Sequence, residues 1–181
     1  MKYPTIFHLI SETFNKAGIS AVLIGGFAVN YYKVTRQTAD VDFLATKKDF
    51  EKAMVLLAKE GYREDYMQEN FARLKGNPSY LMDIDFMFVD KSTFEKIIEA
   101  GKAITIAGQK FIIPSVEHLI ALKLHSIKCN PKLRENKDMS DIIDLMRANK
   151  IDVKKDNFKE LCLKYGNKDL YDKIFNRCHN A

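Results

Sequence analysis

The feature that most constrains the fold is a change of residue pattern at Pro114. Before it, short apolar runs that are typical of strands alternate with amphipathic stretches, whereas every stretch from Ser115 onward has a helical pattern. Strands mixed with helices and then a run of helices indicate the α+β class. We predict a small mixed β-sheet core with flanking helices over residues 1–113. A C-terminal helical bundle, residues 114–181, is expected to pack on this core without a flexible linker.

The individual elements follow from the same patterns. Strands are predicted over 20–24, 41–45, 71–75 and 80–89, and a hairpin is predicted over 103–114. The strands at 71–75 and 80–89 are expected to be antiparallel, joined by the turn "GNPS". Helices are predicted over 5–17, 27–33, 47–61, 92–101, 115–129, 134–148, 153–165 and 168–178.

Composition excludes several classes of protein. The longest apolar run, "AVLIGGFAV", is too short to span a bilayer, and the first residues do not have the pattern of an export signal. The three cysteines are odd in number and form no metal-type pair, so a disulfide framework is not expected. We predict a cytoplasmic protein with no membrane association.

The net charge of +5 is unevenly placed along the chain. Residues 1–100 carry a net charge of −1, and residues 101–181 carry +6. One interpretation is a surface that attracts a polyanion such as RNA or a nucleotide. The other is a solvated helical surface that is rich in lysine, and the charge alone does not decide between them.

Two aspartates, Asp40 and Asp42, lie at the start of the strand predicted over 41–45. Residues two apart on a strand point to the same face, and their like charges repel unless a cation lies between them. Mg²⁺ prefers such carboxylate oxygens together with water and substrate phosphate. A turn or cap before the strand is the competing interpretation, because aspartate is common there.

A second strand repeats this pattern, since Asp83 and Asp85 interrupt the apolar run "YLMDIDFMFV". A buried carboxylate without a partner is unfavourable, so these residues favour a three-carboxylate metal site. Asp85 is the preferred third ligand because it precedes an apolar segment as Asp42 does. Asp83 faces the same way and remains an alternative.

Gly25 and Gly26 lie where the strand over 20–24 turns into the next helix. Glycine lets the backbone approach a ligand closely, and amides at a helix start can bind phosphate. The chain has neither a P-loop nor a G-x-G-x-x-G sequence. A glycine pair is also common in turns that bind nothing.

Together these residues resemble the minimal nucleotidyltransferases of the DNA polymerase beta superfamily. The resemblance consists of Gly25-Gly26, the R-x-T-x-D-x-D sequence formed by Arg36, Thr38, Asp40 and Asp42, and the later Asp85. With "IALKLHSIK" and "NKDMSDIIDL" downstream, the chain looks most like the AbiEii-type group, which includes toxins of toxin–antitoxin systems.

The resemblance implies a mechanism. Gly25, Gly26 and Thr38 would belong to the site of an NTP such as ATP, and Arg36 would clamp its phosphates. Asp40 and Asp42 would bind one or two Mg²⁺ ions, and Asp85 would complete the site. Arg36 could instead pair with Asp40 or Asp42.

Lys123 interrupts an apolar helical stripe, so it must either extend to solvent or meet an anion. In AbiEii-like proteins a lysine at this position contacts the triphosphate. Lys137, Asp138 and Asp141 match a "KD…D" segment of the same group, and at least one of the two aspartates is expected to point inward. A salt-bridged helix surface is the alternative for all of them, and we favour it for Lys137.

Three aromatic residues, Tyr66, Phe71 and Tyr80, could stack on a base, although core packing is the more common role of a single aromatic side chain.

The leading functional hypothesis is Mg²⁺-dependent transfer of a nucleoside monophosphate from an NTP to a hydroxyl of tRNA or another RNA, a protein or a small molecule. The alternative is a non-catalytic nucleotide- or RNA-binding protein on the same fold. In either case the partner could be a cognate antitoxin.

Overall fold

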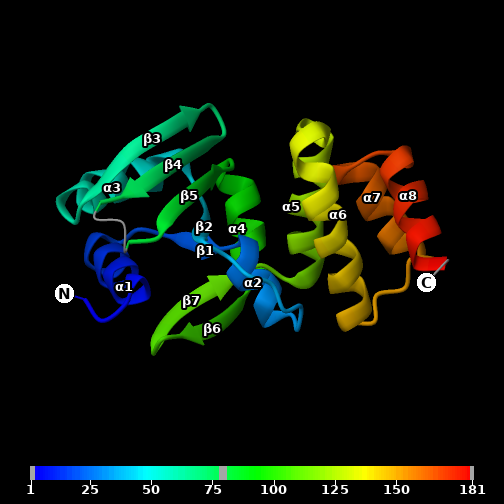
Figure 1. The fold of residues 1–181 in the computed structure, drawn as a ribbon, viewed down its shortest axis with the longest axis horizontal. Helices are drawn as coiled ribbons and strands as arrows, with labels where there is room; N and C mark the ends of the chain where they lie inside the picture. Colours follow the sequence, from blue (N-terminus) through cyan, green and yellow to red (C-terminus); the bar gives the residue numbers. More distant parts are fainter. Residues whose placement is uncertain (1–2, 78–80, 180–181) are drawn as a thin grey trace. The chain divides into compact units, whose positions relative to one another are not determined.

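The computed structural model describes residues 3–77 and 81–179. The chain divides into two compact units, of which the first comprises residues 1–28 and 37–115 and the second comprises residues 29–36 and 116–181. The first unit holds the β-sheet, and the second is helical, which confirms the predicted α+β class. The course of the chain can be followed by colour in Figure 1. Packing of the C-terminal bundle on the core stays a prediction.

The first unit contains both helices and strands. They are α1 (Ile6–Ala17), β1 (Ala21–Leu23), α2 (Gly25–Tyr31, which continues into the second unit), β2 (Asp40–Ala45), α3 (Lys47–Lys59), β3 (Tyr62–Gln68), β4 (Phe71–Gly76), β5 (Asp83–Phe88), α4 (Lys91–Glu99), β6 (Lys102–Ile106) and β7 (Gln109–Ile113). The second unit continues with α5 (Val116–Cys129), α6 (Pro131–Ala148), α7 (Asp156–Tyr165) and α8 (Lys168–His179).

In the described residues the sheet has seven strands, in the order β3-β4-β5-β2-β1-β7-β6. It is mixed, as predicted: β2 runs parallel to β5, and β1 runs parallel to β7, while the other neighbours are antiparallel. The pairing of β4 with β5 confirms the antiparallel arrangement expected from the sequence.

Aromatic side chains build the core on one face of the sheet. Phe43 of β2 and Phe86 of β5 are fully buried and stack with their ring centroids 5.8 Å apart. Phe14 of α1 contacts both rings, and Phe50 of α3 contacts Phe86. Each such burial contributes on the order of 1.5–3 kcal/mol, so this cluster fixes β2 beside β5. Side chains alternate along a strand, so the residues next to Phe43 in β2 and next to Phe86 in β5 point to the other face of the sheet.

The second unit is a set of packed helices. Helix α5 contacts α6 and α7, and α8 contacts α6 and α7. The short segment 29–36 belongs to this unit, and the amide of Asn149 donates a hydrogen bond to the carbonyl oxygen of Tyr32 over 3.2 Å. None of the helices in the described ranges combines the length and the apolar character that a membrane span requires.

Strand β3 is the main difference from the predicted elements, because no strand is predicted over residues 62–68. After Tyr62 all of its residues are exposed, so it lacks the apolar alternation by which half-buried strands are recognised. The predicted strand over 80–89 is observed from Asp83 to Phe88. Its first residue, Tyr80, and part of the "GNPS" turn lie outside the described residues.

Candidate active site

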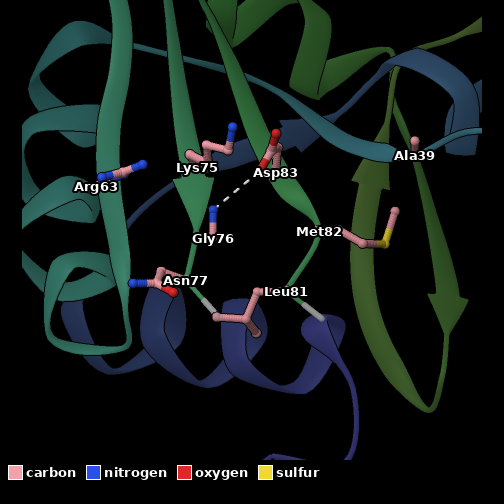
Figure 2. Close-up of a pocket in the computed structure, with 8 residues that line it drawn as sticks. All are labelled: Ala39, Arg63, Lys75, Gly76, Asn77, Leu81, Met82 and Asp83. Carbon is pink, nitrogen blue, oxygen red and sulfur yellow. Dashed lines mark hydrogen bonds between the residues drawn. The ribbon is translucent and has the colours of Figure 1, made fainter. Parts of the chain in front are cut away.

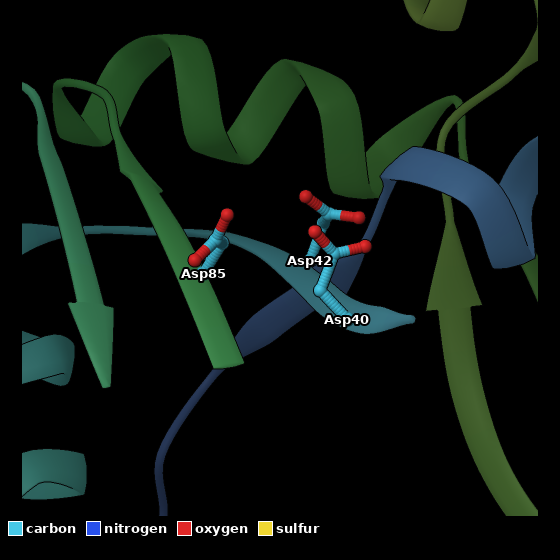
Figure 3. A group of neighbouring side chains, drawn as sticks. All are labelled: Asp40, Asp42 and Asp85. Atoms are coloured by element: carbon cyan, nitrogen blue, oxygen red, sulfur yellow. The ribbon is translucent and has the colours of Figure 1, made fainter. Parts of the chain in front are cut away.

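The parallel pairing of β2 and β5 brings the two acidic strands into register. Asp40 is paired with Asp83 and Asp42 with Asp85, so four carboxylates share one face of the sheet. Asp40, Asp42 and Asp85 offer oxygen atoms that all lie within 4.8 Å of one another. Figure 3 shows their side chains pointing to the same side of the two strands.

This carboxylate triad fits a hard divalent cation. Mg²⁺ is bound in proteins by one or more carboxylates together with water and substrate phosphate, which is the donor set that the triad offers. Asp85 is 4% exposed, and the other two side chains are half-buried. Three negative charges so close together, partly shielded from water, require positive charge nearby.

Asp83, the alternative third ligand, makes a different contact. Its Oδ1 accepts a hydrogen bond from the backbone N–H of Gly76 on β4, over 3.2 Å. Its carboxylate therefore fixes the end of the β4–β5 hairpin. Asp85 is the member of the second acidic strand that meets Asp40 and Asp42.

Arg73 of β4 supplies positive charge to the triad. It lies directly opposite Asp85 in the antiparallel pair, and its Nε and Nη2 donate hydrogen bonds of 2.7 and 2.6 Å to the two carboxylate oxygens. Its Nη2 is also 4.0 Å from the carboxylate of Asp40. The hydrogen bonds to Asp85 are the main reason why the guanidinium pKa is raised above its ordinary value.

The glycine pair packs against the same group. Gly25 has a positive φ of 61°, and a methyl group in place of its hydrogen would overlap the carboxylate of Asp42. A methyl group on Gly26 would lie 2.6 Å from Cβ of Thr38. Both positions therefore require glycine. The first two residues of α2 lie directly beside the triad strand β2.

Thr38 joins the glycine turn to the carboxylates. A side chain on Gly26 would overlap the Thr38 hydroxyl. This hydroxyl donates to the carbonyl oxygen and to Oδ1 of Asp40, each over 3.1 Å. The structure thus brings together Gly25, Gly26, Thr38, Asp40, Asp42 and Asp85, all from the first unit.

The remaining predicted residues form a charge cluster in the second unit. Lys123 on α5 is 6% exposed, and its Nζ donates hydrogen bonds to Asp138 over 3.0 Å and to Asp141 over 2.5 Å. Both aspartates lie on α6 and are buried, which confirms that at least one points inward. Of the two alternatives for Lys123, it meets an anion rather than solvent.

Arg36 belongs to this cluster too. Its Nη1 donates to Asp141 on α6 over 2.5 Å. The alternative pairing of Arg36 with Asp40 or Asp42 stays a prediction. Asn30 orients the backbone of Arg36 through two hydrogen bonds, of 2.8 and 2.9 Å. Two cations and two carboxylates thus compensate each other. Lys137, by contrast, is exposed on the helix surface.

A hollow of about 520 Å³ lies in the first unit beside the ends of β4 and β5 (Figure 2). Its walls include Arg63 and Lys75, as well as Asp83 with its hydrogen bond to Gly76. Ala39, which precedes Asp40 in the chain, also lines it. The hollow therefore adjoins β2 and β5, the two strands that carry the triad.

Sequence reasoning missed two residues of these clusters, Arg73 and Asn30. Arg73 lies in a predicted strand, but only the β4–β5 register shows that it faces Asp85. Asn30 carried no signal, because its role depends on the loop that returns Arg36 to it.

A mixed sheet with a glycine turn and three carboxylates on neighbouring strands is the arrangement expected of the nucleotidyltransferase class. Residues 3–180 match the family described as "Uncharacterised nucleotidyltransferase", and the chain belongs to this family. No protein of curated function matches its sequence.

Solved structures of low sequence identity share the fold. The antibiotic-resistance factor ANT(2'')-Ia is 13% identical with a TM-score of 0.64, and the match covers 97% of this chain and 96% of that one. The lincosamide antibiotic adenylyltransferase LnuA, solved with lincomycin, is 18% identical with a TM-score of 0.53 over 76% and 92%. A putative nucleotidyltransferase from Thermotoga maritima is 13% identical with a TM-score of 0.51 over 70% and 86%.

Proposed function

We propose that this protein transfers a nucleoside monophosphate from an NTP to an acceptor hydroxyl, with Asp40, Asp42 and Asp85 as the metal-binding residues. The observation that carries the proposal is the triad itself, with carboxylate oxygens from two paired strands within 4.8 Å of one another. Three carboxylates this close repel one another, which favours a cation-binding role for them.

The reaction that we propose is an exchange of bonds at the α-phosphorus. The acceptor oxygen forms a bond to this phosphorus, the bond to the bridging oxygen breaks, and pyrophosphate leaves. When bound, Mg²⁺ would neutralise charge on the triphosphate and lower the pKa of the acceptor hydroxyl. Asp85, close to both other carboxylates, would accept the hydroxyl proton.

We assign the triphosphate to the side of the triad next to Gly25 and Gly26. Because they lack side chains, the backbone lies directly against Asp42 and Thr38, and Thr38 offers a hydroxyl there. Arg36 and Lys123 remain proposed phosphate contacts. Because both are paired with Asp141, a phosphate would have to share or replace these ion pairs. We propose Asp138 and Asp141 as the residues that hold the two cations, and Lys137 as a surface residue.

The test uses two isosteric variants of one strand. The protein is incubated with each α-³²P-labelled NTP, Mg²⁺ and either total RNA or lysate, and labelled products are separated. Asp85→Asn should reduce labelling by at least about a hundredfold, because it removes a charge from the metal site. Asp83→Asn keeps an acceptor for the Gly76 amide and should label as the wild type does. Equal labelling by both variants would show that the triad assignment is wrong.

The acceptor hydroxyl is open to three classes, and the labelled product identifies it. An RNA, such as a tRNA end, is supported by the basic C-terminal part of the chain. A small molecule is suggested by the relatives of this fold, one of which was solved with adenylyl-2''-tobramycin and another with lincomycin. A protein hydroxyl is the third class.

We also propose a toxin role with a cognate antitoxin, supported by the match of Lys123, Asp138 and Asp141 to the AbiEii-like pattern. Expression should then arrest growth, and the Asp85→Asn variant should not. If the wild type labels nothing with any NTP, the protein is the non-catalytic nucleotide- or RNA-binding alternative.

A further inference from the structure

The hairpin of β3 and β4 carries a set of side chains on the same sheet face as the triad. Directly opposed residues of an antiparallel pair point to the same face. Arg73 is opposed to Asp85, so its neighbours at alternate positions share the triad face. These side chains, called here the hairpin face, are Arg63, Tyr66 and Gln68 of β3 and Phe71, Arg73 and Lys75 of β4.

A bulge in β3 decides which residues reach this face. The register shifts between Glu64 and Tyr66, so that Arg63 opposes Lys75 and Tyr66 opposes Arg73. In a regular strand, Asp65 would share the face with Arg63. The bulge replaces this carboxylate with a tyrosine, and re-aiming a side chain next to a functional site is a common use of bulges.

The cations of the hairpin face are available to a ligand. Arg63 and Lys75 are exposed, and within the described part of the chain neither forms an ion pair. Both line the hollow shown in Figure 2. Asp83, on the wall of the hollow, accepts a hydrogen bond from the Gly76 amide. Its carboxylate therefore competes less with an entering anion for Arg63 and Lys75. The hollow therefore suits a phosphate group better than a cationic ligand.

The aromatic residues of the same face are also open. Tyr66 is 48% exposed, and its ring centroid lies 6.3 Å from that of the half-buried Phe71. An exposed tyrosine on an edge strand contributes little to a core, whereas its flat face offers a stacking surface. Aromatic rings together with cations that follow a backbone are the features by which proteins bind single-stranded nucleic acid.

The strand order gives the direction of approach. The glycine turn, where we place the triphosphate, lies against Asp42 and Thr38 on the β1 side of β2. Strands β5, β4 and β3 extend from the triad in the opposite direction. A chain lying over β3 and β4 would reach Asp85 without crossing the triphosphate.

From these observations we propose that the hairpin face binds a single-stranded polynucleotide and presents its end to the triad as the acceptor. The role of the polynucleotide as acceptor rests on the proposed function. Binding of the polynucleotide to the hairpin face does not depend on it. Arg63 and Lys75 hold phosphates, and Tyr66 and Phe71 stack on bases.

Binding is measured by fluorescence anisotropy without any NTP, using a fluorescein-labelled single-stranded RNA of roughly 12 nucleotides and a DNA of the same sequence. Tyr66→Leu keeps an apolar side chain but removes the ring, and should weaken binding by about fivefold or more. Arg63→Gln with Lys75→Gln should lower the steepness of log Kd against log salt by about 1.4, or about 0.7 for each cation.

Two matched control variants test whether the loss of any exposed tyrosine or any exposed lysine would weaken binding as much as a change in the hairpin face. Tyr31→Leu removes a tyrosine of nearly equal exposure, 49%, that lies in the second unit. Lys48→Gln removes an exposed lysine of α3. Both should bind the RNA within about twofold of the wild type. If the hairpin variants match these controls, or neither polynucleotide binds, the proposal is overturned.

A failure of this proposal can be told from a failure of the proposed function. Labelling of a small molecule or a protein by a chain that binds no polynucleotide would overturn the hairpin-face proposal and leave nucleotidyl transfer standing. Binding that depends on Tyr66, Arg63 and Lys75, in a chain that labels nothing with any NTP, would leave the hairpin-face proposal standing and overturn the transfer.

Discussion

Arg73 and Asp85 form a two-pronged ion pair across β4 and β5, with both carboxylate oxygens engaged at 2.7 and 2.6 Å. Asp85 is almost completely buried, whereas the side chain of Arg73 is 40% exposed. The guanidinium therefore reaches the triad from the solvent side and holds the carboxylate that a metal ion would also need. A cation entering the triad must compete with Arg73 for Asp85.

The first prediction concerns this competition. Arg73→Gln should lower the free energy of unfolding by roughly 1–3 kcal/mol, because it leaves the buried Asp85 without its charged partner. Exposure of Arg73 favours the lower end of this range. Mn²⁺ should then raise the melting temperature of the variant more than that of the wild type, because a bound ion replaces the lost charge.

The control is Arg63→Gln, which replaces an exposed arginine of β3 and should change the free energy of unfolding by less than about 0.5 kcal/mol. Equal Mn²⁺ shifts in wild type and Arg73→Gln would contradict the competition.

The second prediction separates backbone strain from steric overlap at the glycine turn. Gly25 and Gly18 have nearly equal positive φ values, 61° and 59°, so alanine at either position should be unfavourable by about 1–2 kcal/mol. Only at Gly25 would the methyl group also displace Asp42, since nothing lies within 4 Å of a methyl group on Gly18. Calorimetric titration with Mn²⁺ should therefore show weaker binding for Gly25→Ala and unchanged binding for Gly18→Ala. Unchanged binding in both would mean that Asp42 is not a ligand.

The third prediction concerns the buried charge cluster of the second unit. Lys123→Met leaves Asp138 and Asp141 with less positive charge in a buried setting, and should lower the free energy of unfolding by roughly 3–5 kcal/mol. Lys137→Met, on the exposed side of α6, should have an effect within about 0.5 kcal/mol. Urea denaturation of both variants measures the difference. Similar stabilities would show that Arg36 alone compensates the two aspartates.

The fourth prediction uses the cysteines. Burial raises the pKa of Cys162 to about 12 from an ordinary value of 9.0. A thiol-specific reagent at about pH 8 should modify the exposed Cys129 rapidly and Cys162 only after unfolding. Because the native state holds this proton more tightly than the unfolded state, stability should fall as the pH rises from about 9 towards 12. Cys162→Ala should flatten that part of the pH profile, and an unchanged profile would contradict the assignment.

The fold was largely predictable because most of its elements bury an apolar face. Strands such as β2 and β5, and the hairpin of β6 and β7, have apolar runs bounded by turn residues. Strand β3 was not predictable by this route. It is held by hydrogen bonds to β4 and by a single buried residue, Tyr62, and its exposed polar side chains give no periodic signal.

Part of the candidate site was predictable, because a charged side chain is unfavourable in a buried, apolar segment unless it has a partner. Aspartates in an apolar strand and a lysine on an apolar helical stripe each called for a partner, which drew attention to Asp85 and Lys123. The identity of the partners depends on pairing over long distances in the sequence. Arg36 and Asp141 are 105 residues apart, and only the β4–β5 register shows that Arg73 faces Asp85.

The parallel register of β2 and β5 has a consequence for how the chain folds. A slip of one residue would turn the aspartates of one strand toward the phenylalanine core, and a slip of two would separate Asp42 from Asp85. Bringing the two strands together also concentrates four negative charges on one face, which opposes their association. A divalent cation bound at the proposed triad would offset this repulsion in the native register. Refolding in Mg²⁺ would thus favour the native alignment of two segments that lie about 40 residues apart in the chain.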